Sequence, residues 1–205
     1  CDKHLRGAEQ GVWIRRLERE HDNLRAASEW CTAEGGEGDK ALRLGVALFR
    51  FWWSRGYLTE GRSHMLGALA ADTGGEPTSA RATVLHAAGW IAKMQGDLDS
   101  AQTMMEKSIE VRREIGDKSG LAGTLNILGL VVQGKGRLDE AQKLYEEGLA
   151  LQRELKSERG IANTLLNLGV LALHRGDVEG AERAWGEALA VYRRAGDKLY
   201  TAGLL

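Results

Sequence analysis

Apolar residues recur along the chain at spacings of three and four, which is the period of a helix that buries one face. The clearest stretch lies between residues 121 and 155, where two such runs flank the turn Gly134-Lys-Gly-Arg137. The first run is Leu121, Leu125, Leu128, Val131 and Val132, and the second is Leu138, Ala141, Leu144, Tyr145 and Leu149. This pattern predicts two helices joined by a glycine-centred turn, that is, a helical hairpin.

The hairpin pattern repeats with a period of 40 residues. Residues 81–120, 121–160 and 161–200 align without a gap, and residues 41–80 form a more diverged unit. The columns that recur include Gly89/Gly129/Gly169, Gly96/Gly136/Gly176 and Ala101/Ala141/Ala181. Residues 201–205 resemble residues 121–125, and we expect them to begin a further, truncated repeat. A fixed period of this length predicts a stacked array of hairpins.

The two glycine columns have different expected roles. Gly96, Gly136 and Gly176 suit a left-handed helix end, and the following Asp97 and Asp177 suit a helix cap. The column of Gly89 lies inside a helix, where glycine costs about 0.5–1 kcal/mol relative to alanine. We therefore expect the second helix of each hairpin to approach there too closely for a side chain, with Ala101, Ala141 and Ala181 as the nearest points.

The spacing Leu125-x-x-Leu128-Gly129 with Ala141-x-x-x-Tyr145 resembles the tetratricopeptide repeat signature. The usual unit has 34 residues, so these units are about six residues longer. Long units of this kind resemble those of bacterial peptide-sensing regulators, kinesin light chains and cell-polarity adaptors. The resemblance implies an all-α fold: a right-handed superhelix, or α-solenoid, of about four helical hairpins with a preceding helix.

A further helix is predicted over residues 12–34, with apolar Trp13, Leu17, Leu24, Ala27 and Trp30. We assign residues 12–40 to a capping or linking helix. It resembles the helix that begins the repeat region of bacterial signal-transduction ATPases of the STAND class. That resemblance implies a sensor or arm attached to a nucleotide-binding switch module. Because the sequence opens without a methionine and ends inside a repeat, we expect it to be a fragment of a longer polypeptide.

Composition limits the partners, cofactors and location that we expect for this chain. The net charge of −1 and the isoelectric point near 6.6 provide no global attraction to nucleic acid or to an anionic membrane. The two cysteines form neither a disulfide framework nor a metal-ligand spacing. No apolar run reaches the roughly 18 residues needed to span a bilayer. We expect a cytoplasmic protein without metal or cofactor, and no membrane or nucleic-acid partner for this fragment.

Candidate catalytic chemistry is sparse. The stretch from Gly129 to Gly136 nearly matches a phosphate-binding loop, but it lacks the final Ser or Thr that would hold magnesium. Its glycines are explained by the repeat columns. The five histidines have no helical spacing with Cys, Asp or Glu that would form a metal site. We predict that the chain is not an enzyme.

Binding is the better expectation, since stacked hairpins leave their first helices along a concave face. The resemblance places these side chains there: Arg43, Arg50, Trp53, His86, Trp90, Lys93, Asn126, Gln133, Asn163 and His174. Cations beside aromatic rings suit an acidic or amphipathic peptide, and asparagine amides suit a peptide backbone. Trp53 and Trp90 are alternatively core residues between repeats, and the asparagines are alternatively solvated helix residues.

We therefore predict a protein or peptide interaction module that binds its partner on the concave face of the repeats and is the sensor or arm of a larger bacterial signalling ATPase or regulator. Two alternatives stay open: a structural scaffold that self-assembles, and a domain that senses a peptide or small molecule. Self-association is expected through apolar Leu199, Tyr200, Leu204 and Leu205 at the truncated end.

Overall fold

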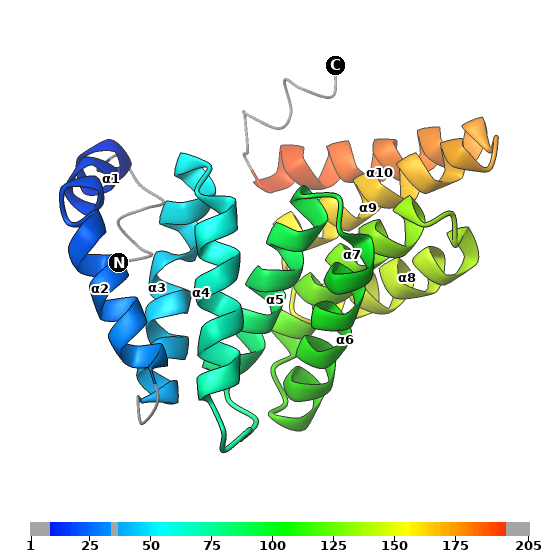
Figure 1. Cartoon of the computed structure of the whole chain (residues 1–205). Helices are drawn as coiled ribbons and strands as arrows, with labels where there is room; N and C mark the ends of the chain where they lie inside the picture. Colours follow the sequence, from blue (N-terminus) through cyan, green and yellow to red (C-terminus); the bar gives the residue numbers. More distant parts are fainter. Residues whose placement is uncertain (1–8, 34–36, 196–205) are drawn as a thin grey trace. The chain divides into compact units, whose positions relative to one another are not determined.

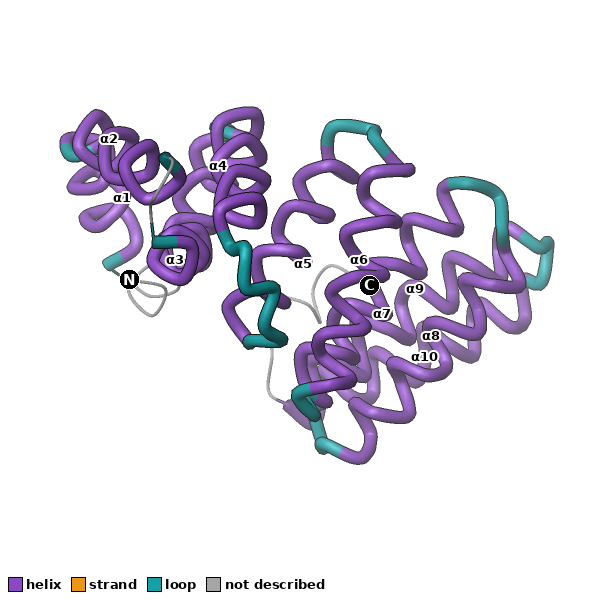
Figure 2. The backbone as a smooth tube through the Cα atoms, turned by 60° about the horizontal axis from the view of Figure 1, so that its bottom comes forward, coloured by secondary structure: helices purple, strands orange, loops and turns teal. Residues whose placement is uncertain are grey.

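The computed structural model describes residues 9–33 and 37–195, which consist of helices and their connections, with no strand (Figures 1 and 2). The helices are α1 (Gln10–Arg19), α2 (His21–Thr32), α3 (Gly38–Arg55), α4 (Leu58–Ala71) and α5 (Ser79–Met94). They continue with α6 (Leu98–Glu114), α7 (Lys118–Gly134), α8 (Leu138–Glu154), α9 (Glu158–His174) and α10 (Val178–Ala195). The prediction of an all-α fold of helical hairpins is confirmed.

The helices fall into two compact units, one ending at Ile115 and the other beginning at Gly116. Unit 1 holds α1 and α2 followed by the hairpins α3–α4 and α5–α6. Unit 2 holds the hairpins α7–α8 and α9–α10. Within each unit the two helices of a hairpin pack side by side, and successive hairpins also contact each other.

Each unit has an apolar core that the repeat pattern builds. In unit 1, Leu42, Phe51, Trp52, Met65 and Ile91 are at most 2% exposed. In unit 2, Leu125, Tyr145, Leu171 and Tyr192 are similarly buried. With Met105 of α6, which is also buried, the buried residues come from both helices of each hairpin, so each hairpin is stabilised by apolar surface shared with its neighbour.

Turns between paired helices follow the predicted geometry. Gly136 has φ of 78° and closes α7 in the left-handed conformation. Asp97 and Asp177 accept hydrogen bonds from the backbone N–H of Ser100 and Gly180, at 3.1 and 2.8 Å. These bonds satisfy N–H groups that a helix start otherwise leaves without a partner.

The mid-helix glycines do mark close approach of the second helix, but the expected contact residue is wrong in unit 2. A Cβ atom on Gly169 would lie 2.7 Å from Cε2 of Trp185, and the neighbour of Gly129 is the ring of Tyr145. The alanines, Ala141 and Ala181, are not the nearest points. The large side chain four residues after each alanine, Tyr145 or Trp185, lies over the glycine instead. Only at Gly89 does the alanine column contribute, through the carbonyl oxygen of Ala101 at 3.2 Å.

The segment before the hairpins contains two helices rather than the single helix expected. Glu20 separates α1 from α2, with φ of −95° and ψ of 8°, outside the helical range. α2 packs against α3 and α4, so it occupies the place of a second helix in an incomplete hairpin. The residues expected to drive self-association, Leu199, Tyr200, Leu204 and Leu205, lie outside the described residues.

Candidate partner-binding site

In unit 1 the predicted site residues lie on the first helices, α3 and α5, and form two cation–aromatic pairs. The guanidinium carbon of Arg50 lies 6.0 Å from the ring centroid of Trp53, and Nζ of Lys93 lies 5.4 Å from that of Trp90. Trp53 is 44% exposed, whereas its neighbour Trp52 is 2% exposed. Trp52 is therefore the core residue, and Trp53 is available at the surface.

Two further predicted residues complete this face of unit 1. Arg43 is exposed and lies 3.7 Å from the carboxylate of Asp39, a distance typical of a weak surface ion pair. His86 is partly buried on α5, and burial, helped by the charge of Arg112, lowers its pKa to about 4. His86 is consequently neutral at pH 7, so the positive charge of the face comes from the arginines and the lysine.

In unit 2 the predicted polar residues bond to one another across helices. Oδ1 of Asn126 on α7 accepts hydrogen bonds from Oγ1 of Thr164 and Nδ2 of Asn167 on α9, at 3.2 and 3.1 Å. Oδ1 of Asn163 accepts a 2.6 Å bond from the hydroxyl of Tyr192. Within the described part of the chain, Nδ2 of Asn126 and of Asn163 has no partner. These amides remain donors for a ligand.

Gln133 and His174 also come together, with 3.2 Å between Nε2 of Gln133 and Nδ1 of His174. Gln133 is 8% exposed, and its Oε1 accepts a 2.8 Å bond from the hydroxyl of Tyr145. Burial raises the pKa of Tyr145, so this hydroxyl keeps its proton and donates. Gln133 thus has a structural bond within its hairpin, while His174 is exposed at the end of α9.

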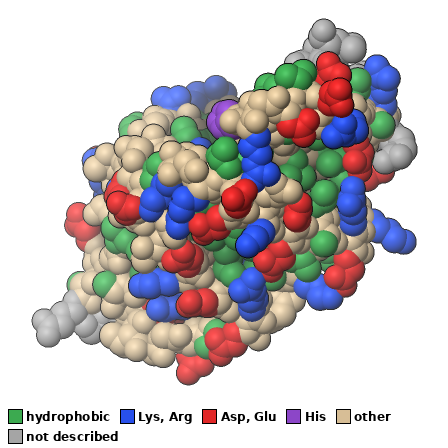
Figure 3. All heavy atoms as spheres, turned by 90° about the vertical axis from the view of Figure 1, so that its right-hand side faces the viewer, with side chains coloured by type: hydrophobic (Ala, Val, Ile, Leu, Met, Phe, Trp, Pro, Cys, Tyr) green, Lys and Arg blue, Asp and Glu red, His purple; other side chains and the backbone are tan. Residues whose placement is uncertain are grey.

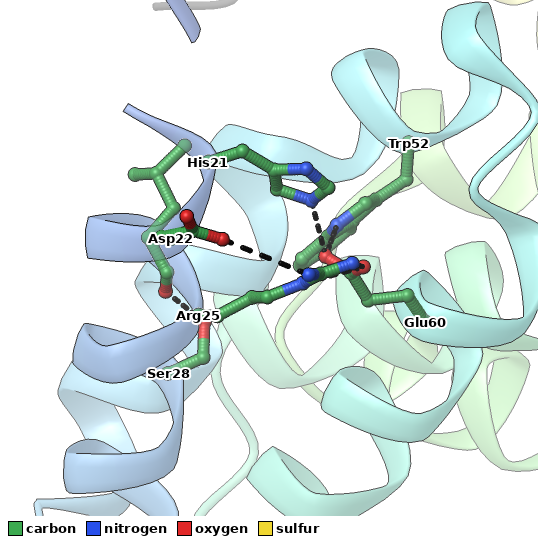
Figure 4. Close-up of polar contacts among 7 residues, drawn as sticks. His21, Asp22, Arg25, Ser28, Trp52 and Glu60 are labelled. Carbon is green, nitrogen blue, oxygen red and sulfur yellow. Dashed lines mark hydrogen bonds and ion pairs between the residues drawn. The ribbon is translucent and has the colours of Figure 1, made fainter. Parts of the chain in front are cut away.

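A polar cluster around Glu60 was not foreseen from the sequence (Figure 4). Oε1 of Glu60 on α4 lies 2.6 Å from Nε2 of His21 and accepts a 3.2 Å bond from Nε1 of Trp52. Oε2 accepts bonds from Nε and Nη2 of Arg25 on α2, at 3.0 and 2.6 Å. Burial alone would raise the pKa of Glu60, but these hydrogen bonds outweigh burial and lower it.

No signal in the repeat could have located the Glu60 cluster. The positions 40, 80 and 120 residues after Glu60 hold Ser100, Glu140 and Gly180, so a carboxylate recurs in only one of the three later repeats. Its partners His21 and Arg25 precede the repeats. Only the packing of α2 on α4 brings them together.

Acidic and basic side chains are interspersed over the face drawn in Figure 3. Among residues 9–33 and 37–195, no group of three or more His, Cys, Asp or Glu side chains is arranged to hold a metal ion. In the same residues, no helix combines the length and the apolar character needed to cross a membrane.

Paired helices repeated along the chain define the class of helical-repeat proteins. Family models described as "Tetratricopeptide repeat" match residues 81–115 and residues 120–194. These two stretches of the chain are tetratricopeptide repeats, as the residue spacing predicted. No curated protein sequence matches the chain.

Several solved structures share the fold of this chain. BtubC (BKLC) from P. vanneervenii is similar with a TM-score of 0.77 and 19% identity, covering 92% of this chain and 77% of that one. The apo form of RapI has a TM-score of 0.78 and 14% identity, covering 95% and 72%. A Rap protein complexed with Competence and Sporulation Factor has a TM-score of 0.74 and 14% identity, covering 96% and 55%. At these identities the likeness establishes the fold alone.

Proposed function

We propose that the repeats bind a protein or peptide partner along the first helices of the hairpins, and that binding rather than catalysis is their function. The observation that carries this proposal is the pairing of Arg50 with Trp53 and of Trp90 with Lys93 on the first helices. Tryptophan and arginine are the residues on which binding energy most often concentrates. Trp53 is exposed and the other three side chains are half-buried, and each pair holds ring and charge together before a partner arrives.

The chemistry of this face favours an acidic or amphipathic peptide. Arg43, Arg50 and Lys93 supply positive charge, and the two tryptophan rings supply apolar area. An acidic side chain would gain charge-assisted hydrogen bonds there, and an apolar side chain would cover the rings. On unit 2, Nδ2 of Asn126 and Asn163 would donate to carbonyl oxygens of an extended backbone.

We further propose that these repeats are the sensor or arm of a larger bacterial signalling ATPase that acts in the cytoplasm. The resemblance of residues 12–34 to the helix that begins such repeat regions supports this. A Rap protein of similar fold has been crystallised with a bound factor, which supports a ligand-holding role for the fold. A partner bound more tightly by one state of the attached switch would shift the switch toward that state.

The test is a selection of random peptides displayed on phage against the purified chain. Enriched peptides should be acidic with at least one aromatic residue, and the triple variant Arg50→Ala/Trp90→Ala/Lys93→Ala should bind them at least about tenfold more weakly. Lys107→Ala, exposed on the second helix α6, is the matched control and should bind as the unaltered chain does. Peptides that bind the triple variant undiminished would place the binding surface elsewhere.

Self-assembly is a second candidate. Val170 and Leu173 on α9 are 40% and 43% exposed, and Val178 on α10 is 57% exposed, which favours an apolar contact at this end of unit 2. Sedimentation of the chain and of a Val170→Ser/Leu173→Ser variant tests this. A monomer at all concentrations would exclude self-assembly through these residues.

A further inference from the structure

A pocket of about 330 Å³ lies in unit 1 between α2 and α4, with α3 as its floor. Its floor is apolar and includes Leu48, Phe51 and Trp52. The volume is at the lower end of the range of about 300–1,000 Å³ found for small-molecule sites. The pocket is separate from the first-helix face, because its walls are the second-helix elements α2 and α4.

The repeat explains why this groove is hollow. His64 and Gly67 line the pocket from α4, and the equivalent positions hold Met104 and Lys107 in the next repeat. Met104 is a partly buried side chain that packs against the core of unit 1. The following repeat has Leu144 at the position of His64. Among these three repeats, only the one that lines this groove has a polar side chain, His64, where the others have an apolar one. It is also the only one of the three with a glycine, Gly67, where the others have a long side chain.

The pocket wall carries hydrogen-bonding groups that the fold does not use. His64 is 9% exposed, and its Nε2 is buried without a hydrogen-bond partner in the described structure. Burial lowers the pKa of His64, against the opposing effects of a hydrogen bond with the Ala41 backbone and of the Glu60 charge, so the ring is neutral at pH 7. A buried polar atom without a partner costs stability, and a native site that keeps one calls for an explanation.

The charges around the pocket favour a cation. The Glu60 carboxylate is already neutralised by Arg25, with which it forms two hydrogen bonds. The Glu29 carboxylate also lines the pocket, and in the described part of the chain it has no hydrogen bond or ion pair. The hydroxyl of Ser63 is likewise without a partner there and can accept. One unneutralised carboxylate remains beside these groups.

We propose that this pocket binds a small organic amine, with its ammonium group near Glu29 and Ser63 and its apolar body over the α3 floor. An anion fits less well, because Arg25 is committed to Glu60 and Glu29 would repel it. The same alkylammonium chemistry exists in a free amine and in a lysine side chain of a partner protein. Both sources would use the same groups of the pocket.

Calorimetric titration of the purified chain tests the proposal with three compounds of matched size: 2-phenylethylamine, 2-phenylethanol and phenylacetate. The amine should bind, the neutral alcohol roughly tenfold more weakly, and the anion not measurably. Nα-acetyl-lysine methylamide, titrated in parallel, separates the sources: binding as tight as that of the amine assigns the pocket to a lysine side chain. Equal binding of amine and alcohol, preference for phenylacetate, or no binding of either amine overturns the proposal.

Two variants locate the binding. His64→Met restores the type of residue found at Met104, so it should fill the pocket, keep or raise the melting temperature and abolish amine binding. Glu29→Gln changes an exposed residue and should weaken amine binding about threefold to fivefold while leaving the alcohol unchanged. Glu110→Gln on α6, also exposed, is the matched control. Undiminished amine binding by folded His64→Met would place the amine outside this pocket.

Discussion

Gly129 of α7 lies against the phenol ring of Tyr145 of α8, so closely that a Cβ atom on Gly129 would be 2.7 Å from Cδ1 of that ring. Real Cβ atoms do not make contacts this short, so either the ring or the helix must move to admit one. Tyr145 is fully buried and its hydroxyl is bonded to Gln133, which leaves the ring little freedom. The glycine is a packing requirement of the hairpin.

Gly129→Ala should therefore destabilise the chain by about 1–3 kcal/mol, despite the higher helix propensity of alanine. Urea unfolding followed by circular dichroism measures the change. Gly123→Ala is the matched control in the same helix, since Gly123 is exposed and a Cβ there would meet nothing within 4 Å. That variant should gain about 0.5–1 kcal/mol. If both variants are stabilised alike, the contact with Tyr145 is not a constraint.

Lys156 takes the left-handed conformation that glycine takes at the equivalent position of the preceding repeat, with φ of 53° against 69° for Gly116. A residue with a Cβ atom costs roughly 1–2 kcal/mol in the left-handed conformation. Glycine avoids this cost, but part of the gain is offset because glycine loses more conformational entropy on folding. We expect Lys156→Gly to raise the free energy of unfolding by about 0.5–1 kcal/mol. Lys143→Gly, exposed inside α8, should lower it by a similar amount. A loss of stability in both variants would mean that Lys156 is not strained.

The sequence period predicted the hairpins, the glycine turns and the capping aspartates, because each depends on residues close together in one repeat. The contact of Gly129 with Tyr145 was assigned to the wrong residue, since the direction in which a large side chain folds is not visible in a spacing. Trp52 and Trp53 illustrate the same limit. Adjacent helix positions differ by about 100° in direction, and only the packed structure shows which ring is buried.

The Glu60 cluster lay beyond sequence reasoning for a different reason. Its members come from α2, α3 and α4, and Arg25 is 35 residues from Glu60. No column relates them, so their meeting depends on where the incomplete first hairpin docks. The predicted ligand face stays a prediction, because exposure and pairing of its residues do not identify a partner.

Glu60 is expected to hold α2 against the first complete hairpin. Glu60→Gln removes the charge that attracts Arg25, and we expect the free energy of unfolding to fall by about 1–3 kcal/mol. Because the pKa of Glu60 is lowered on folding, this contribution is present above the unfolded pKa of a glutamate and is lost as pH falls through the folded value. Thermal unfolding from pH 7 to pH 3 should show the two proteins converging in acid. Glu110→Gln serves as the control, and a constant gap at all pH values would contradict the assignment.

His86 should give the chain a second, separate pH dependence. Its pKa is lowered from 6.5 to about 4, because burial and the Arg112 charge disfavour the protonated ring. Between these values the unfolded chain binds a proton that the folded chain does not, so His86 should lower stability as pH falls from 6.5 to 4, by up to about 3 kcal/mol. His86→Asn introduces the residue found 40 positions later, Asn126, and removes this dependence. His64, whose pKa is also lowered, is present in both proteins, so the difference between their unfolding free energies isolates His86. A difference that does not change across this pH range would show that His86 is protonated in the folded chain as readily as in the unfolded one.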